Sequence, residues 1–469
     1  MAPLRRWTII PWLFLSIGII LGSWWAYAVL GWGGYWAWDP VENASFLPWL
    51  TATAFIHSTM VQERKRMLKL WTISLALASF VLTILGTFMT RSGIFNSVHS
   101  FTQSDIGPTF LAFIAVLLVL CIGLLSARGH LLVAEGSVRS FASREASILV
   151  NNLVFVAITF TVLLGTLYPL ISEAVRGVRV SVGEPYFNKM AVPGGIAVLF
   201  LMGVGPMLPW GSSDKATLRR QFLVPAAVGV GVTVACYLAG LRGFYPLLTF
   251  GLAGFVTLVT LRELALPVRV RMRERNEGAL SALLGSATKA RRRFGGYVVH
   301  LAIVLVIVAI AASSSYVTHT TATLRQGERF TIGDYSVKYL GLETGQEPHR
   351  TFVATKLEIT PPGGGSVDLL KPRMNYYERM TDPVGSPGVR ERPGEDLYVS
   401  LLAFSERGAT ASFNAWIFPL VGWIWWSIPL LVLGSLISIW PARRSRSAQA
   451  GRPGAPAVAA PVPGERGAA

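Results

Sequence analysis

The chain is poor in cysteine. Only two of its 469 residues are cysteines, and both Cys121 and Cys236 lie within long apolar runs that predict helices. The sequence therefore offers no thiol pair for a structural disulfide, no cysteine cage for a metal and no C-x-x-C-H motif. Any redox chemistry would need a cofactor that is bound without thioether bonds to this chain.

Charge is also scarce. Charged residues make up 14% of the chain, hydrophobic residues 52%, and the mean hydropathy is +0.50, a balance that excludes a soluble globular protein. Apolar stretches of membrane-spanning length cover residues 9–31, 45–62, 70–90, 109–126, 147–171, 193–210, 223–241, 246–264, 295–315 and 415–440. We therefore predict an all-α polytopic membrane protein with about ten transmembrane helices.

Acidic residues are the rarer of the two charge types, and the net charge is +17. The cations lie between the predicted helices, and a cytoplasmic N-terminus places nearly all of the basic loops on the cytoplasmic side. These segments are Arg64–Lys69, Arg128–Arg144, Lys215–Arg220, Arg262–Arg293 and the tail from Arg443. A nucleic-acid surface would gather its charge on one folded face, so we predict membrane lipid but no nucleic acid as a partner, with both termini cytoplasmic.

The sequence shows no secretory signal and no internal repeat, but one long segment leaves the membrane. Residues 316–414 are rich in Thr, Gly, Tyr and charge, with strand-like stretches at Phe330–Tyr339, Thr351–Thr360 and Asp396–Phe404. We predict membrane helices over 1–315, a small, mainly β extracytoplasmic domain over 316–414, a last membrane helix over 415–440 and a disordered cytoplasmic tail over 441–469.

One loop at the predicted outer surface is unusually aromatic. The run Trp32-Gly33-Gly34-Tyr35-Trp36-Ala37-Trp38-Asp39-Pro40 holds four aromatic residues and two glycines. Clustered indoles form flat apolar faces and glycine allows a rigid ligand to approach the backbone, so the loop is suited to a porphyrin. An aromatic belt at the membrane interface is the alternative interpretation.

The last residues of this loop have the sequence signature of a helix N-terminus. Asp39 at N-cap, Pro40 at N1 and Glu42 at N3 form a capping pattern, which we take as the primary role of these residues. The cap would fix the aromatic loop onto the helix that also carries His57.

Two of the six histidines lie within predicted membrane helices. Placing an ionisable side chain inside a bilayer costs free energy, so such residues usually have a function. His57 and His300 lie about equally far, roughly 8 Å, from the predicted cytoplasmic ends of their helices. Neutral imidazoles on facing helices can hold a haem iron from both sides, whereas separate hydrogen bonds to neighbouring helices are the alternative. His99 falls in an outward loop and could reach an iron at the aromatic loop, while His319, His349 and His130 fit exposed positions.

Several sequence blocks resemble one family. The aromatic loop with its flanks, from Gly22 to Ser45, is similar to the tryptophan-rich signature of the CcmF-type cytochrome c biogenesis proteins, members of the haem-handling superfamily. Further blocks that resemble the family in the family's order are Leu85–Phe88, Arg91–Gly93, Ser97–Phe101, Ser181–Asn188 and Asp396–Val399. The resemblance covers nearly the full length of the chain.

The resemblance implies a haem lyase of cytochrome c maturation in a bacterial inner membrane. Such a protein receives haem from a haem chaperone, works with thiol-handling components and promotes thioether attachment of haem to the C-x-x-C-H motif of apocytochrome c. By the resemblance, His57 and His300 would ligate a permanent haem b. His99 would ligate the transiting haem over Trp32, Gly33, Trp36, Trp38 and Asp39, and Arg91 is the nearest outward cation for the haem propionates.

The chain departs from the family pattern at two points. Family members usually begin with several further helices and an outward loop with a second external histidine, so either the start is truncated or another chain supplies that histidine; His319 is a conceivable replacement. Tyr35 stands where tryptophan is commoner, and a tyrosine retains the ring face.

Three other functions compete with this one. A CcsA-type cytochrome c synthase component shares the aromatic loop, but it is usually shorter. Haem transport without bond chemistry would use the same loop and histidines. An electron-transfer cytochrome b subunit would leave the aromatic loop unexplained.

Overall fold

A computed structural model describes residues 2–95, 106–212, 214–364, 367–378, 380, 382–405 and 408–441. Residues 1–439 form one compact unit, and the fold and site described below lie within it. The predicted disordered tail lies, apart from Pro441, outside the described residues.

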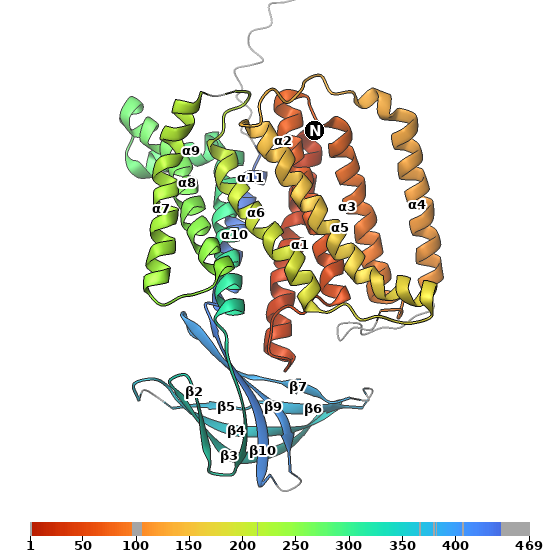
Figure 1. Cartoon of the computed structure of the whole chain (residues 1–469), viewed down its shortest axis with the longest axis vertical. Coiled ribbons are helices and arrows are strands. Elements are labelled where there is room, and N and C mark those ends of the chain that lie inside the picture. Colours follow the sequence, from red (N-terminus) through yellow and green to blue (C-terminus); the bar gives the residue numbers. More distant parts are fainter. Residues whose placement is uncertain are drawn as a thin grey trace, which may run out of the picture. The chain divides into compact units, whose positions relative to one another are not determined.

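The first part of the chain is helical. Within the described residues, nine helices are long and apolar enough to cross a membrane. They are α1 (Ala2–Val29), α3 (Lys69–Arg91), α4 (Gly107–Arg128), α5 (Arg144–Arg176), α6 (Glu184–Met207), α7 (Lys215–Leu238), α8 (Phe244–Arg275), α10 (Arg291–Ser315) and α11 (Gly422–Ile439). Figure 1 shows these helices side by side. The predicted class of polytopic helical membrane protein with a β domain is confirmed.

The remaining predicted span, residues 45–62, falls in α2 (Pro40–Lys65), which is not among the nine helices apolar enough to cross a membrane. Helix α2 packs against α1, α3 and α5 (Figure 1), and several of its polar side chains bond to these neighbours. Trp12 of α1 donates its indole N–H to the Thr53 hydroxyl at 2.8 Å, and the hydroxyls of Ser58 and Thr72 lie 2.7 Å apart. Helix α2 is therefore a polar helix surrounded by other helices, and Thr53 and Ser58 find their partners on those neighbours.

One short helix was not predicted. Helix α9 (Ala279–Lys289) follows α8 within the long basic segment. Its 11 residues are too few to cross a bilayer. Apolar runs of membrane-spanning length therefore do not reveal this helix. A short 3-10 turn, η1 (Gly129–Leu132), similarly follows α4.

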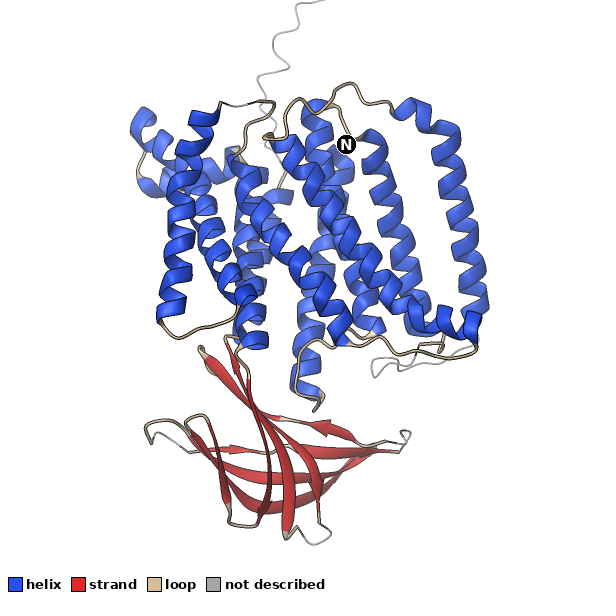
Figure 2. Cartoon of the chain, viewed as in Figure 1, coloured by secondary structure: helices blue, strands red, loops and turns tan. Residues whose placement is uncertain are grey.

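The second part of the chain is a β domain of two antiparallel sheets, shown in red in Figure 2. One sheet has the order β1-β10-β9-β8, the other the order β2-β3-β4-β6-β7, with β5 paired to β4. The strands are β1 (Thr318–Arg325), β2 (Arg329–Ile332), β3 (Tyr335–Glu347), β4 (Arg350–Thr360), β5 (Asp368–Leu370), β6 (Arg373–Tyr377), β7 (Val384–Ser386), β8 (Gly388–Arg390), β9 (Glu395–Phe404) and β10 (Thr410–Pro419).

The strand-like stretches of the sequence match these strands. Residues 330–339 form the β2–β3 hairpin, whose turn uses Gly333 at φ +51°, and residues 351–360 and 396–404 lie in β4 and β9. Val337, Leu357 and Phe413, all fully buried, are part of the domain core. The last helix begins at Gly422, after β10 has run to Pro419, so the predicted start at residue 415 was too early.

The β domain and the helices share a hydrophobic cluster. Tyr398 and Phe418 of the β domain pack with Tyr27 of α1 and Ile424 of α11. The strands are thereby fixed at the end of α1, where the aromatic loop begins.

Candidate functional site: a histidine pair and an aromatic loop

The structure brings His57 of α2 and His300 of α10 together. Their ring centroids are 6.4 Å apart and their planes differ by 19°. Helix α2 ends eight residues after His57 and α10 begins nine residues before His300, so the two side chains lie about 12 Å and 14 Å from the arginine-rich ends of their helices. The matched depth expected from the sequence is present, about one helical turn deeper.

The hydrogen bonds of the pair leave ring nitrogens available to a ligand. His57 Nδ1 lies 2.8 Å from the Thr53 carbonyl oxygen. Since a carbonyl only accepts, Nδ1 carries the proton, and Nε2 keeps its lone pair. Nδ1 of His300 is buried and has no hydrogen-bond partner in the described structure. His57 is thus oriented by the backbone as metal-ligating histidines usually are, and His300 has a buried ring nitrogen that a ligand could satisfy.

The spacing of the two rings fits one metal between them. Bonds from a metal to an imidazole nitrogen are about 2 Å long, so two nitrogens on one metal lie about 4 Å apart, with roughly one ring radius added on each side up to the centroids. The observed 6.4 Å is compatible with that sum. Among the described residues no group of three or more His, Cys, Asp or Glu side chains could hold a metal. Two imidazoles therefore suit a metal that brings its own equatorial ligands, as haem does.

The two helices that carry the pair are not packed closely against each other. Both histidines are only partly buried, and α2 and α10 are not among the closely packed helix pairs of the described chain. An ion-pair cluster joins the same helices at their arginine-rich ends, where Glu63 of α2 lies 2.8 Å from Arg5 of α1 and 3.6 Å from Arg292 of α10. Helices that carry the two histidines are thus linked without being pressed together.

The aromatic loop ends in the predicted cap. Asp39 accepts a hydrogen bond from the Val41 N–H at 2.8 Å, and the Glu42 carboxylate accepts from the N–H groups of Ala37 and Asp39 at 2.9 and 3.1 Å. This capping box confirms the structural role assigned to Asp39, Pro40 and Glu42. It also holds the loop to the helix that carries His57.

The indoles of the loop do not lie in one plane. Trp36 and Trp38 meet at 87° with centroids 5.9 Å apart. Trp38 stacks on Phe187 of α6 at 5.1 Å and donates its indole N–H to the Asn188 side chain at 2.8 Å. Trp32, whose N–H is bonded to the Gly34 carbonyl, is 36% exposed. The expected flat platform is therefore a set of tilted rings, since each indole follows its own neighbours.

The two glycines of the loop have different surroundings. A Cβ on Gly33 would lie 2.5 Å from the Trp416 ring, whereas a Cβ on Gly34 would meet nothing within 4 Å. Gly33, at φ +85°, is therefore required for close contact with the β domain rather than for approach of a ligand. Gly34 is the position open to a ligand.

The middle of the loop is tied to the histidine helix α10. The Tyr35 hydroxyl lies 2.8 Å from the Ser313 hydroxyl, 13 residues or about 20 Å along α10 from His300. Burial raises the pKa of Tyr35, although its bonds to Ser313 and Ser314 act in the opposite direction. Tyrosine thus offers a ring and a polar anchor at this position.

The other predicted site residues lie in different parts of the chain. His99 lies outside the described residues, as does the whole block 97–101. Arg91 is the last residue of α3. His319 is exposed on β1 and stacks on Trp416 at 4.9 Å, and His349 lies in the turn between β3 and β4. Four residues at the loop were not predicted as site residues, although the first three lie in blocks that resemble the family: Phe187, Asn188, Tyr398 and Trp416.

Fold and site together define a multi-pass membrane protein in which an aromatic loop joins a helix that contributes one half of a histidine pair. Comparisons identify this class: a family model described as cytochrome C assembly protein matches residues 2–95, from α1 to the end of α3. The chain belongs to the CcmF/CycK family of bacterial cytochrome c-type biogenesis proteins.

Sequence relatives match almost the whole chain. It is 36% identical to the cytochrome c-type biogenesis protein CycK of Rhizobium meliloti over 442 residues, which are 93% of this chain and 64% of the relative. It is 32% identical to the protein ccl1 of Rhodobacter capsulatus, with 96% of this chain and 67% of the relative covered. The chain thus spans slightly less than two-thirds of the length of the R. meliloti protein.

A solved structure also matches nearly all of this chain and about two-thirds of its own length. The structure of "Cytochrome c Heme Lyase CcmF" superposes with a TM-score of 0.73 at 33% identity, covering 93% of this chain and 66% of that one. The fold of helices and β domain described above is therefore the fold of that relative.

Proposed function

We propose that this chain is the haem-handling part of a haem lyase of cytochrome c maturation. It would receive haem from a haem chaperone, present it at the aromatic loop and promote its thioether attachment to the C-x-x-C-H motif of apocytochrome c, together with thiol-handling components. The observation that carries the proposal is the His57–His300 pair, with near-parallel rings 6.4 Å apart on helices that also anchor the aromatic loop.

The proposed inner site holds a permanent haem b between His57 and His300. When bound, haem supplies reversible one-electron chemistry. The chain contributes the ligand set: the Thr53 carbonyl holds the proton of His57 on Nδ1, which leaves the lone pair of Nε2 for a metal.

The proposed outer site handles haem as a substrate. With the arginine-rich helix ends in the cytoplasm, the aromatic loop and the β domain lie on the opposite face of the membrane. Trp32 and Trp36 offer ring faces, Gly34 leaves the backbone open, and Trp38 and Asp39 fix the loop against α6 and α2. His99 is the proposed ligand of the transiting iron.

Removal of either inner histidine tests the proposal. In His57→Ala or His300→Ala, the b-type absorbance of the purified protein should fall at least about tenfold and cytochrome c maturation in the host should fall with it, because one imidazole alone holds the iron weakly. The matched control is His130→Ala, which removes a histidine from the turn after α4. Full absorbance and full maturation in both inner variants would refute the proposal.

A further inference from the structure

The segment that joins α1 to the aromatic loop, and the start of the loop itself, are bonded to the β domain through their backbone. We propose that the β domain clamps this segment, residues 30–33, in the conformation that presents haem, and that Tyr398, Ser400 and Asn375 are positioning residues of the clamp. The inference rests on the proposed function of the loop, and it gives the β domain a definite task within that function.

One arm of the clamp comes from β9. The Tyr398 hydroxyl donates to the Leu30 carbonyl at 2.6 Å and accepts from the Gly33 N–H at 3.3 Å. Two residues further along the strand, the Ser400 hydroxyl donates to the Gly31 carbonyl at 2.8 Å. Since side chains at i and i+2 of a strand point to the same face, the two hydroxyls act on the loop from one side.

Tyr398 is itself held firmly. Its side chain is fully buried, and its ring lies 5.1 Å from Tyr27 of α1 and 5.4 Å from Trp416 of β10. Burial raises the pKa of Tyr398, so the hydroxyl remains protonated and able to donate. The buried ring thus fixes the position of the hydroxyl that bonds both the Leu30 carbonyl and the Gly33 N–H.

The other arm comes from β7. The Gly31 N–H donates to the Gly385 carbonyl at 2.8 Å. Strand β7 has only three residues and lies at the edge of its sheet, so it needs support of its own. The fully buried Asn375 of β6 supplies it, because its amide N–H₂ donates to the Val384 carbonyl at 3.0 Å and to the Ser386 hydroxyl at 2.9 Å.

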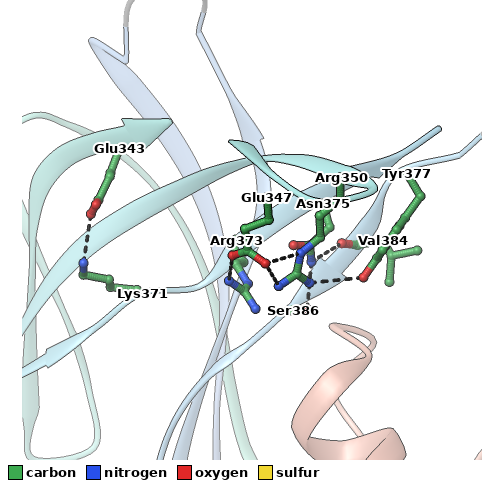
Figure 3. A network of polar contacts seen from close by, with 9 residues as sticks. All are labelled: Glu343, Glu347, Arg350, Lys371, Arg373, Asn375, Tyr377, Val384 and Ser386. Atoms are coloured by element: carbon green, nitrogen blue, oxygen red, sulfur yellow. Dashed lines mark hydrogen bonds and ion pairs between the residues drawn. The ribbon is translucent and has the colours of Figure 1, made fainter. Parts of the chain in front are cut away.

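Figure 3 shows this support within a wider polar network. Beside Asn375, Arg350 donates to Glu347 at 2.9 Å and to the Tyr377 hydroxyl at 3.2 Å, and Arg373 lies 3.6 Å from Glu347. These contacts link β3, β4 and β6, and β6 is the strand that pairs with β7. Strand β7, which bonds Gly31, is therefore held by the side-chain contacts of β6 and by the polar network beside them.

The fit of the loop in the clamp is close. A Cβ on Gly31 would lie 2.8 Å from the Ser400 hydroxyl oxygen, and one on Gly33 would lie 2.5 Å from the Trp416 ring. At its other end, the loop is fixed by the cap at Asp39. The five residues between these fixed points, 34–38, carry Trp36 and Trp38, so holding both ends restricts the arrangements open to their indoles.

The test compares hydrogen exchange and haem handling in the full chain. We expect the double variant Tyr398→Phe/Ser400→Ala to exchange the amides of residues 30–36 about tenfold faster or more, since it loses three hydrogen bonds to the loop. Cytochrome c maturation should fall, while the absorbance of the inner haem is retained. Gly33→Ala, which displaces the loop from Trp416 without changing the β domain, should have the same effects.

The matched control is Tyr339→Phe, which removes a buried hydroxyl that donates to the Gly408 carbonyl at 2.9 Å in the same domain. It should leave the exchange of residues 30–36 unchanged. The clamp is refuted if exchange stays at the wild-type rate in the double variant, if exchange rises but maturation is unaffected, or if Tyr339→Phe loosens the loop equally. These outcomes leave the test of the inner histidines untouched, so the two proposals can fail separately.

Discussion

At the scale of single residues, the junction of the β domain with α1 contains a carboxyl group in an unfavourable place. Asp396 is 1% exposed, and it accepts hydrogen bonds from the Tyr27 hydroxyl at 3.2 Å and from the Arg392 N–H at 3.1 Å. Burial raises the pKa of Asp396 from an ordinary 3.8 to about 6, even though the bond from Arg392 acts to lower it. The folded protein therefore binds this proton more tightly than the unfolded chain does.

This shift predicts the sign of a pH effect. Because the folded-state pKa is the higher one, the free energy of unfolding should rise as pH falls from 7 through 6 toward 4, by up to about 3 kcal/mol. Asp396→Asn cannot ionise and should lack this component. We expect the thermal midpoint of the wild type to drop more than that of the variant when the pH is raised from 4.5 to 7.5. Parallel pH profiles for the two proteins would contradict the assignment.

At the scale of elements, the cap of α2 links the aromatic loop to the helix of His57. Asp39→Ala should destabilise the start of α2 by about 1 kcal/mol, because the Val41 N–H loses its acceptor. We expect reduced cytochrome c maturation with the inner haem absorbance largely retained, since His57 lies more than four turns further along the helix.

Asp39→Asn separates the cap from the charge. Asparagine caps helices about as well as aspartate, so this variant should restore both thermal stability and maturation. If Asp39→Asn were as defective as Asp39→Ala, the carboxylate would have a chemical role that the capping box does not explain.

At the scale of the whole molecule, the sequence predicted the spanning helices and the equal depth of the two histidines, because hydropathy and a rise of 1.5 Å per residue depend only on local sequence. It also predicted the cap at Asp39, whose partners lie within three residues. The end of β10 was mistaken for membrane helix because Ala415, Ile417 and Phe418 are apolar, although buried residues alternate along most of that strand.

The arrangement of the aromatic loop could not be predicted in the same way. Asn188 holds the Trp38 indole, and Tyr398 and Trp416 contact Gly33; these partners lie 150 to 383 residues away along the chain. Such contacts arise only from the packed fold. The composition of the loop therefore predicted clustered indoles correctly, but the prediction that they form a flat platform was wrong.

The orientation of the whole chain in the membrane can be measured directly. In a Cys121→Ser/Cys236→Ser background, Thr331→Cys, on exposed β2, should react with a membrane-impermeant maleimide in intact spheroplasts. Val138→Cys, which lies in the segment between η1 and α5, should react only after permeabilisation. This pattern follows from placing the basic segments in the cytoplasm, and the reverse pattern would invert the proposed faces.

The central claim is that His57 and His300 hold one iron between them. Electron paramagnetic resonance of the oxidised, purified full chain tests it most directly. We predict a low-spin signal typical of two imidazole ligands in the wild type, lost in both His57→Ala and His300→Ala and unchanged in His130→Ala. A wild-type protein that binds no haem, or a bis-imidazole signal that survives in either inner variant, would contradict the claim.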